Sequence, residues 1–511
     1  MSFNLNTGGS KHSISKNLMS GKDEKEISSK TSHSSSNSNQ VILTEKYSTY
    51  GREILYVQPP DQNVLVAVAT ETSLAGNIQD GFRKFFQEIF LPQGYPNSVS
   101  SDYTQYQIWD TAQAFCSTIT GTLATHAVMK GVGVGDVEAT PLAATITWVL
   151  KEGTGNVGRI AFAWWKGTSL DADSKRWRLM ADCLNDAAIC LELTLPLFQG
   201  YTTHVLCVST AMKSIVGVAG GATRAALTQH QAIRGNLADV AAKDGSQETA
   251  VNLIASFAAI LIISLVGTNI WPVFFIFTAM HIFSNYRGVS SVCLHTFNST
   301  RFLETALFFL QYEIILPPIL ANSMEPVFFF KNRLTDKTIC GFKIKVGGSL
   351  KALIASGTVT LDSLKVATDT FQNSKYLIVF DMKKKCIHIV LDDAADSEDI
   401  LCGYFNAIIF GVIVSTIKKE KLLITQDYTS GEKSSSNTSF HSVCGSMKDL
   451  HSSEEDSINP PSPEVYSQVK KVTNTEWEKF SNGLKISGWN LEKNLIISQE
   501  WRASWKYEVK T

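Results

Sequence analysis

The sequence has few charged residues and no excess of positive ones. Only 18% of its 511 residues are charged and 44% are hydrophobic, whereas about 25% charged is usual for a soluble protein. The formal net charge is −1, and no Lys- and Arg-rich face with interleaved aromatic residues occurs. Because nucleic-acid binding depends on neutralising phosphates, we expect no nucleic acid as a partner.

The sequence also lacks a pattern of metal-binding residues. Its nine Cys and ten His are scattered, and no two Cys form a CxxC pair. We therefore expect no metal site and no cofactor. An odd, unpatterned set of Cys fits a reducing compartment inside the cell. The first 30 residues contain no apolar core, so we expect no secretory signal.

Motifs for catalysis are nearly absent. No Ser/His/Asp or Cys/His arrangement stands out, and the one formal phosphate-loop pattern is GTGNVG, residues 153–158. A dinucleotide fold requires an Ala-rich helix directly after such glycines. The chain continues instead with the aromatic RIAFAWWKG. The pattern favours a tight turn between helices over a nucleotide site, and we expect a protein that is not an enzyme.

The longest uncharged run is the main evidence for a membrane. No Asp, Glu, Lys or Arg occurs between Glu248 and Arg287. Gly267 and Pro272 interrupt this run and predict two helices, near residues 250–267 and 271–286, joined as a tight hairpin. Each helix is close to the shortest length that crosses about 30 Å of hydrocarbon. A buried helical hairpin in a soluble core is the alternative.

Polar residues directly precede this run. In residues 217–254, the small residues Gly217, Gly221 and Ala225 recur every fourth position and predict a groove for close helix packing. The polar part that follows, residues 236–249, is either a loop at a membrane surface or a polar site between helices. Asp182 and Asp186 lie in another apolar helix, so their carboxylates must face a bundle interior or a polar cavity.

The pattern changes from helical to alternating after residue 325. Phe342, Ile344 and Val346 alternate with Lys, and residues 376–382 and 385–391 predict a β-hairpin. Residues 396–421 predict a helix that covers the sheet, with a further membrane span as the alternative. The aromatic residues of the C-terminal tail, Trp477 among them, predict that the tail docks on this domain.

We therefore predict a mainly α protein with a smaller α+β part, in which a membrane-associated multi-helix bundle precedes a small C-terminal α/β domain. The expected segments are a disordered Ser-rich tail (1–45), the helical domain (46–324), the α/β domain (325–425), a low-complexity linker (426–463) and a Trp-rich helical tail (464–511).

Five stretches resemble a known family. They are FLPQGYPNSVSSDYTQYQIWD (90–110), WRLMADCLND (177–186), ATRAALTQHQA (222–232), NLADVAAKDGSQET (236–249) and HIFSNYRGV (281–289). Together they resemble the root UVB sensitive (RUS) family, over about residues 50–425. The resemblance implies a membrane-associated protein linked to vitamin B6 homeostasis that acts together with another family member. It implies no reaction and no catalytic residue.

Two functions fit these features. The first is a membrane protein, at an intracellular membrane, that binds or moves a small polar metabolite. The second is a membrane-anchored scaffold or regulatory partner of another RUS family protein, in a homo- or hetero-oligomer. An enzyme acting on a form of vitamin B6 is a weaker third. Candidate ligand or partner residues are Asp182, Asp186, Arg224, His230, Asp239, Lys243, Gln247, Glu248 and Arg287, with Asp102 and Asp110 as further pathway candidates.

Overall fold

The computed structural model describes residues 40–46, 53–59, 64–69, 81, 83, 85–131, 141–198, 200–267, 269–328, 334–355, 357, 359–418, 420, 422–423 and 461–505. These form two compact units, Met1–Ser73 and Leu74–Thr511. Residues 1–39 of the predicted disordered tail and 426–460 of the predicted linker lie outside the described residues.

The first unit contains a three-stranded antiparallel sheet. Its strands β1 (Gln40–Lys46), β2 (Glu53–Gln58) and β3 (Val66–Ala69) are paired in the order β1-β2-β3. The prediction of disorder up to residue 45 was therefore wrong at residues 40–45. The segment QVILTEK carries β-branched residues that favour a strand once a partner strand is present.

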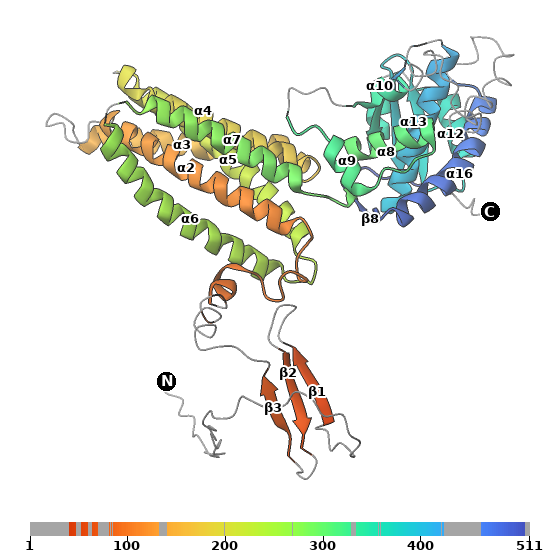
Figure 1. The fold of residues 1–511 in the computed structure, drawn as a ribbon. Coiled ribbons are helices and arrows are strands. Elements are labelled where there is room, and N and C mark those ends of the chain that lie inside the picture. Colours follow the sequence, from red (N-terminus) through yellow and green to blue (C-terminus); the bar gives the residue numbers. More distant parts are fainter. Residues whose placement is uncertain are drawn as a thin grey trace, which may run out of the picture. The chain divides into compact units, whose positions relative to one another are not determined.

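The second unit begins with long helices that run alongside one another (Figure 1). They are α2 (Tyr103–Gly131), α3 (Pro141–Lys166), α4 (Ser174–Leu193), α5 (Thr202–Gln231), α6 (Leu237–Val266) and α7 (Trp271–Ser291). Helix α2 packs against α4, α6 and α7, and α5 packs against α3 and α4. The mainly helical fold is as predicted.

The predicted helix break between α6 and α7 is confirmed. Gly267 ends α6 with a positive φ of 60°, and Pro272 lies in the first turn of α7. The packing differs from the expected tight hairpin, since both helices pack along α2. Helix α6 also begins at Leu237, so most of the polar stretch 236–249 is helical and is not a loop.

The GTGNVG motif lies inside α3, so the predicted turn between helices was wrong. A Cβ atom at Gly155 would lie 2.9 Å from both Ser214 Oγ and Thr210 Cγ2 of α5. The glycines therefore allow α3 and α5 to approach closely and form no phosphate loop. The groove predicted at Gly217 and Gly221 lies on an exposed face of α5, and among the described residues no atom lies within 4 Å of a Cβ atom built at either position.

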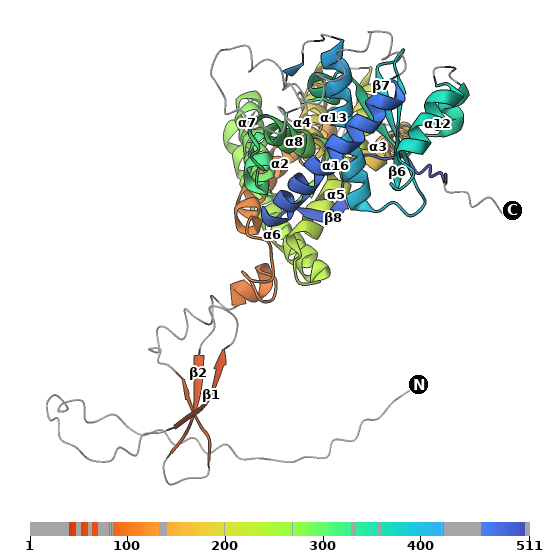
Figure 2. The same ribbon diagram turned by 90° about the vertical axis from the view of Figure 1, so that its right-hand side faces the viewer.

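The C-terminal part of the second unit packs around a three-stranded sheet. Strands β5 (Lys343–Val346), β7 (Cys386–Leu391) and β6 (Tyr376–Asp381) are adjacent in that order, with β6 and β7 antiparallel as predicted. Helix α13 (Ser397–Ile417) begins with a capping box between Asp396 and Asp399 and contacts all three strands. Figure 2 shows α16 (Pro463–Ile486) crossing beside α13.

The C-terminal core begins earlier in the chain than predicted. Phe297 of β4 (Thr296–Phe297) and Phe302 of α8 (Ser299–Tyr312) belong to the same core as the buried residues of α13 and α16. The boundary predicted at residue 324 therefore cuts through this core. Phe297 stacks on Trp489 with ring centroids 3.9 Å apart, and β4 pairs with β8 (Asn490–Asn494). The aromatic tail thus docks on the C-terminal domain, as predicted.

The packing of α13 generates a first prediction. A Cβ atom at Gly411 would lie 2.8 Å from Cys340 Cβ and 2.9 Å from the Cys340 carbonyl oxygen, at the end of α10 (Asp336–Cys340). Gly411→Ala should therefore destabilise the protein by about 1–3 kcal/mol, measured by thermal unfolding of the detergent-purified chain.

Gly121→Ala is the matched control, because Gly121 is also helical and a Cβ atom there would meet nothing within 4 Å. The control should be neutral or stabilising by up to about 1 kcal/mol. Equal unfolding midpoints for Gly411→Ala and wild type would contradict the close approach of α13 and α10.

Candidate functional site

The helices of the second unit hold a row of buried and half-buried polar side chains between them, which we call the polar column. Its members are Gln107, Asp110 and Gln113 on α2, Arg178, Asp182 and Asp186 on α4, Arg224 on α5, Asp244, Gln247 and Glu248 on α6, and His281 and Asn285 on α7.

One end of the polar column joins α2, α5 and α6. Arg224 Nε donates to Asp244 Oδ2 at 2.7 Å, and Arg224 NH1 donates to Glu248 at 2.5 Å. Gln107 Nε2 lies 3.1 Å from both Asp244 Oδ1 and Gln247 Oε1. Because Asp244 is buried while Arg224 and Glu248 keep side-chain exposures of 36% and 41%, this end is open to the surroundings.

The middle of the polar column joins α2 and α4. Arg178 NH2 donates to Asp110 Oδ1 at 3.0 Å, and the Tyr106 hydroxyl donates to the same oxygen at 3.3 Å. One helical turn further along α4, Asp182 Oδ2 accepts from Gln113 Nε2 at 2.8 Å and also from Asn285 Nδ2. Ion pair and amide contacts thus alternate along one face of α4.

The other end of the polar column is an aspartate–histidine pair. Asp186 Oδ2 lies 2.8 Å from His281 Nδ1, and both side chains are almost fully buried. Asp186 Oδ1, His281 Nε2 and Asn285 Oδ1 have no hydrogen-bond partner among the residues that the structure describes. Buried polar atoms normally have partners, so these three atoms mark a place for a further polar group.

The α2–α4–α7 part of the polar column has more acidic than basic side chains. Asp110, Asp182 and Asp186 contribute three carboxyl groups, Arg178 contributes one guanidinium, and the His281 imidazole adds a positive charge only when it is protonated. Burying an uncompensated charge costs several kcal/mol. The arrangement can therefore bind a hydrogen-bond donor or a positive group. Within the described residues, no group of three or more His, Cys, Asp or Glu is placed to hold a metal ion.

Six of the predicted residues lie in the polar column, and five do not. The first set is Asp110, Asp182, Asp186, Arg224, Gln247 and Glu248. Of the others, Asp239 accepts from the Gln93 amide at 2.7 Å, and Lys243 donates to the Glu88 carbonyl. His230 pairs with Asp102, and Arg287 lies over the Trp109 ring at 5.5 Å.

The sequence analysis missed several members of the polar column. Gln107, Gln113, Arg178, Asp244, His281 and Asn285 were not singled out. A signal was available for some of them, because residues 178, 182 and 186 recur every fourth position on α4 and residues 281 and 285 do so on α7. That spacing places each set on one helix face.

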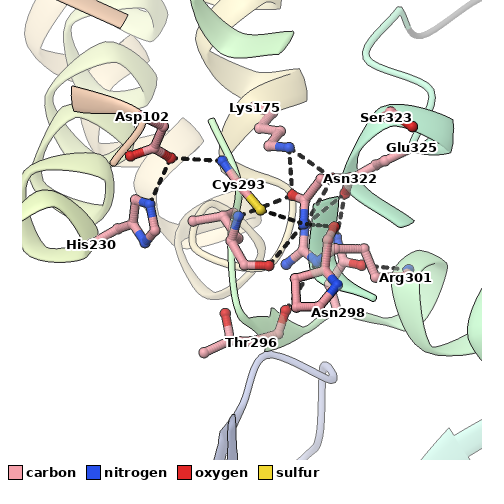
Figure 3. Close-up of polar contacts among 12 residues, drawn as sticks. Asp102, Lys175, His230, Cys293, Thr296, Asn298, Arg301, Asn322, Ser323 and Glu325 are labelled. Atoms are coloured by element: carbon pink, nitrogen blue, oxygen red, sulfur yellow. Dashed lines mark hydrogen bonds and ion pairs between the residues drawn. The ribbon is translucent and has the colours of Figure 1, made fainter. Parts of the chain in front are cut away.

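A second polar group joins the helices to the C-terminal domain (Figure 3). Asp102, just before α2, pairs with His230 at 2.9 Å and accepts from the Cys293 amide at 2.7 Å. Beside it lies the junction network, which comprises Lys175, Asn298, Arg301, Asn322 and Glu325.

Glu325 is the centre of the junction network. It receives Arg301 NH1 at 2.8 Å and lies 3.5 Å from Lys175 Nζ, with all three side chains buried. Burial raises the pKa of Glu325, but the Arg301 guanidinium and the Lys175 ammonium outweigh it and hold the pKa at about 2. Burial lowers the pKa of Lys175 to about 8, although Glu325 acts in the opposite direction. The network therefore holds α4 against the segment after α9 (Pro318–Met324).

The junction network generates a second prediction. Glu325→Gln leaves two buried cations without their carboxylate, so it should destabilise the protein by about 3–5 kcal/mol at neutral pH. Because the folded-state pKa of about 2 lies below the ordinary 4.5, the stabilisation is complete above pH 4.5 and is lost as the pH falls towards 2. Thermal unfolding between pH 7 and pH 3 should show a shallower acid dependence in the variant.

Glu398→Gln is the matched control. Glu398 pairs with Lys485 at 3.0 Å, but these side chains are 42% and 53% exposed, so the change should cost less than about 1 kcal/mol. A Glu325→Gln variant no less stable than this control would contradict the central position of Glu325.

Comparisons with known proteins cover nearly the whole second unit. Residues 77–313 match the family model described as the vitamin B6 photo-protection and homoeostasis domain, and residues 314–505 match the root UVB sensitive protein C-terminal domain. The first region contains the entire polar column.

Several relatives are similar over long stretches. RUS family member 1 of Dictyostelium discoideum is 47% identical over 277 residues, which cover 53% of this chain and about half (51%) of that relative. Protein root UVB sensitive 3 of Arabidopsis thaliana is 31% identical over 428 residues, 82% of this chain and 86% of the relative. Root UVB sensitive 2, chloroplastic, also of Arabidopsis thaliana, is 28% identical over 326 residues, 63% of this chain and 72% of the relative.

No solved structure matches the chain. The family assignment therefore depends on the two family models and on the relatives, which agree along the chain. The chain belongs to the root UVB sensitive (RUS) family.

Proposed function

We propose that the chain is a protein of an intracellular membrane, without enzymatic activity, that binds or moves a small polar metabolite related to vitamin B6. The observation that carries this proposal is the distribution of polarity in the helices α2–α7. Many large apolar side chains lie on the outside, and a group of ionisable side chains lies inside, which is unusual for a soluble protein.

The outward faces of several helices support a bilayer as the surrounding medium. On α6, Phe257 is 67% exposed and Leu265 is 78% exposed, and on α3 Trp164 is 88% exposed. Soluble monomers rarely expose contiguous apolar surface of this kind. Trp164 and Trp165 directly precede Lys166 at the end of α3, a composition typical of the boundary between membrane and water.

Helix α6 is the strongest candidate for a membrane span. By length and composition α5, α6 and α13 could each cross a membrane. Only 11% of the most apolar segment of α6 is buried, whereas 83% of the most apolar segment of α13 is buried, so α13 is a core helix. The uncharged part of α6, residues 250–266, rises about 25 Å at 1.5 Å per residue, close to the thickness of a bilayer's hydrocarbon.

The polar column supports a ligand inside this apolar shell. Ionisable residues within membrane helices are costly and commonly mark pathways for substrates or ions. The vitamin B6 description belongs to the family model that matches residues 77–313, and this region carries the polar column. We therefore infer a ligand related to vitamin B6.

A second candidate function is a membrane-anchored scaffold or regulatory partner of another RUS family protein. Its supporting observation is the stripe of Gly217, Gly221 and Ala225 on α5, which faces outward and is open to another helix. In this case the polar column would be a structural feature that fixes the helix packing.

A third prediction tests the membrane. After alkaline carbonate extraction of cell membranes, the full-length chain should remain in the membrane pellet. Its release would transfer the apolar faces of the helices from lipid into water, which is unfavourable. The fraction in pellet and supernatant is measured by immunoblot, with a peripheral protein as the released control. Recovery of the chain in the supernatant would contradict both candidate functions.

A fourth prediction tests the ligand. At least one vitamin B6 form should raise the unfolding midpoint of the detergent-purified chain, because a ligand that binds only the folded state stabilises it by about 2.7 kcal/mol at 100 times Kd. Arg224→Ala and Glu248→Ala should each reduce this shift, because both side chains form the open end of the polar column. Arg159→Ala, at an exposed position of α3, is the matched control and should keep it.

An absent shift with every form, together with a co-purifying RUS family protein, would favour the scaffold instead. A shift that survives in both variants would place the ligand away from the α5–α6 end of the polar column.

A further inference from the structure

The deepest part of the polar column is a ladder between α4 and α7. Asp182 accepts from Asn285, and Asp186 Oδ2 lies 2.8 Å from His281 Nδ1. Each pair is one helical turn from the next, and the numbering runs in opposite directions, so the two helices are antiparallel here. Gln113 of α2 closes one side through its 2.8 Å contact with Asp182 Oδ2.

The ladder holds unused hydrogen-bonding capacity in its interior. Asp186 Oδ1 and Asn285 Oδ1 are acceptors, and neither has a hydrogen-bond partner within the described part of the chain. His281 Nε2 is a third atom without a partner in that part of the chain, and it is a donor or an acceptor according to the tautomer of the ring. Asp186, Asn285 and His281 are respectively 4%, 2% and 0% exposed, so bulk water does not satisfy them. This is a formed polar site that needs a partner presenting donors.

The charge around the ladder specifies the kind of partner. The carboxylates of Asp182 and Asp186 lie on adjacent turns of α4, and Asp110 of α2 adds a third one turn away. Arg178 is a cation near them, with its Nη2 engaged by Asp110, and His281 is a second group that can carry a positive charge, with its Nδ1 engaged by Asp186. A phosphate brought into this site would meet carboxylates and unpaired acceptors, whereas an ammonium group would meet opposite charge.

We propose that the Asp182–Asp186–His281–Asn285 ladder binds the protonated amine of a small organic cation. This inference rests on the proposed function, since it assigns the ligand class of the polar column. The ammonium donates to Asp186 Oδ1 and Asn285 Oδ1, and its charge balances the buried carboxylates. Among vitamin B6 forms, the amine-bearing and unphosphorylated one is therefore preferred.

The test compares three vitamin B6 forms on the full-length chain in lipid nanodiscs, by isothermal titration calorimetry. Pyridoxamine carries an ammonium group where pyridoxine carries a hydroxyl, so the two differ at the group that matters. Pyridoxal 5′-phosphate adds a phosphate and lacks the ammonium. We expect pyridoxamine to bind roughly tenfold or more tightly than pyridoxine, because hydrogen bonds to charged groups are the stronger ones, and we expect no measurable binding of pyridoxal 5′-phosphate.

Substitutions then locate the binding. Asp186→Asn replaces an acceptor oxygen by an amide N–H, so it should weaken pyridoxamine binding by roughly tenfold or more. Asp182→Asn should weaken it in the same direction and serves as the second variant if Asp186→Asn does not fold. Asp171→Asn is the control, since Asp171 is exposed before α4, and it should leave the affinity unchanged.

The outcomes separate this inference from the proposed function. Equal or tighter binding of pyridoxine or pyridoxal 5′-phosphate would overturn the inference and leave the proposed function standing. Pyridoxamine binding that is unchanged in both carboxylate variants would also overturn it. Failure of all three forms to bind would overturn the inference and the vitamin B6 assignment together.

Discussion

Buried carboxylates on α4 are the constraint around which the helices are arranged. Asp186 is buried and Asp182 is half-buried beside it, so neighbouring helices must supply most of their hydrogen-bond partners. Helix α2 supplies Gln113, and α7 supplies His281 and Asn285. This need explains why α7 packs against α4 as well as along α2. With polar groups inside, the hydrophobic side chains of these helices face outward.

The two parts of the second unit differ in how their most apolar helix is covered. Helices α6 and α13 have similar mean hydropathy, 2.3 and 2.1. In the C-terminal part, α13 is buried between the sheet and α16, and aromatic rings such as Phe405 and Phe480 stack in its core. In the part of the chain that the structure describes, nothing comparable covers the outer face of α6. Glu325 pairs with Lys175 of α4 and with Arg301 of α8, and these ion pairs connect the two parts.

Local sequence patterns predicted individual helices and strands well, and they predicted contacts between distant residues poorly. The β6–β7 hairpin and the α13 helix followed from alternation and capping residues, which act over a few positions. The pairing of Asp186 with His281 joins positions 95 residues apart, and no short pattern encodes it. The GTGNVG motif was wrongly predicted to be a turn. Gly155 of this motif allows α3 to pack closely on α5, a helix that follows later in the chain, so the local sequence does not show its role.

The central claim is that lipid surrounds the apolar faces of the helices that enclose the polar column. Photo-crosslinking tests it most directly, with p-benzoylphenylalanine at the exposed position of Phe257 on α6. In native membranes, irradiation followed by mass spectrometry should give adducts with lipid acyl chains. Adducts with another polypeptide and none with lipid would contradict the claim, because α6 would then be covered by protein.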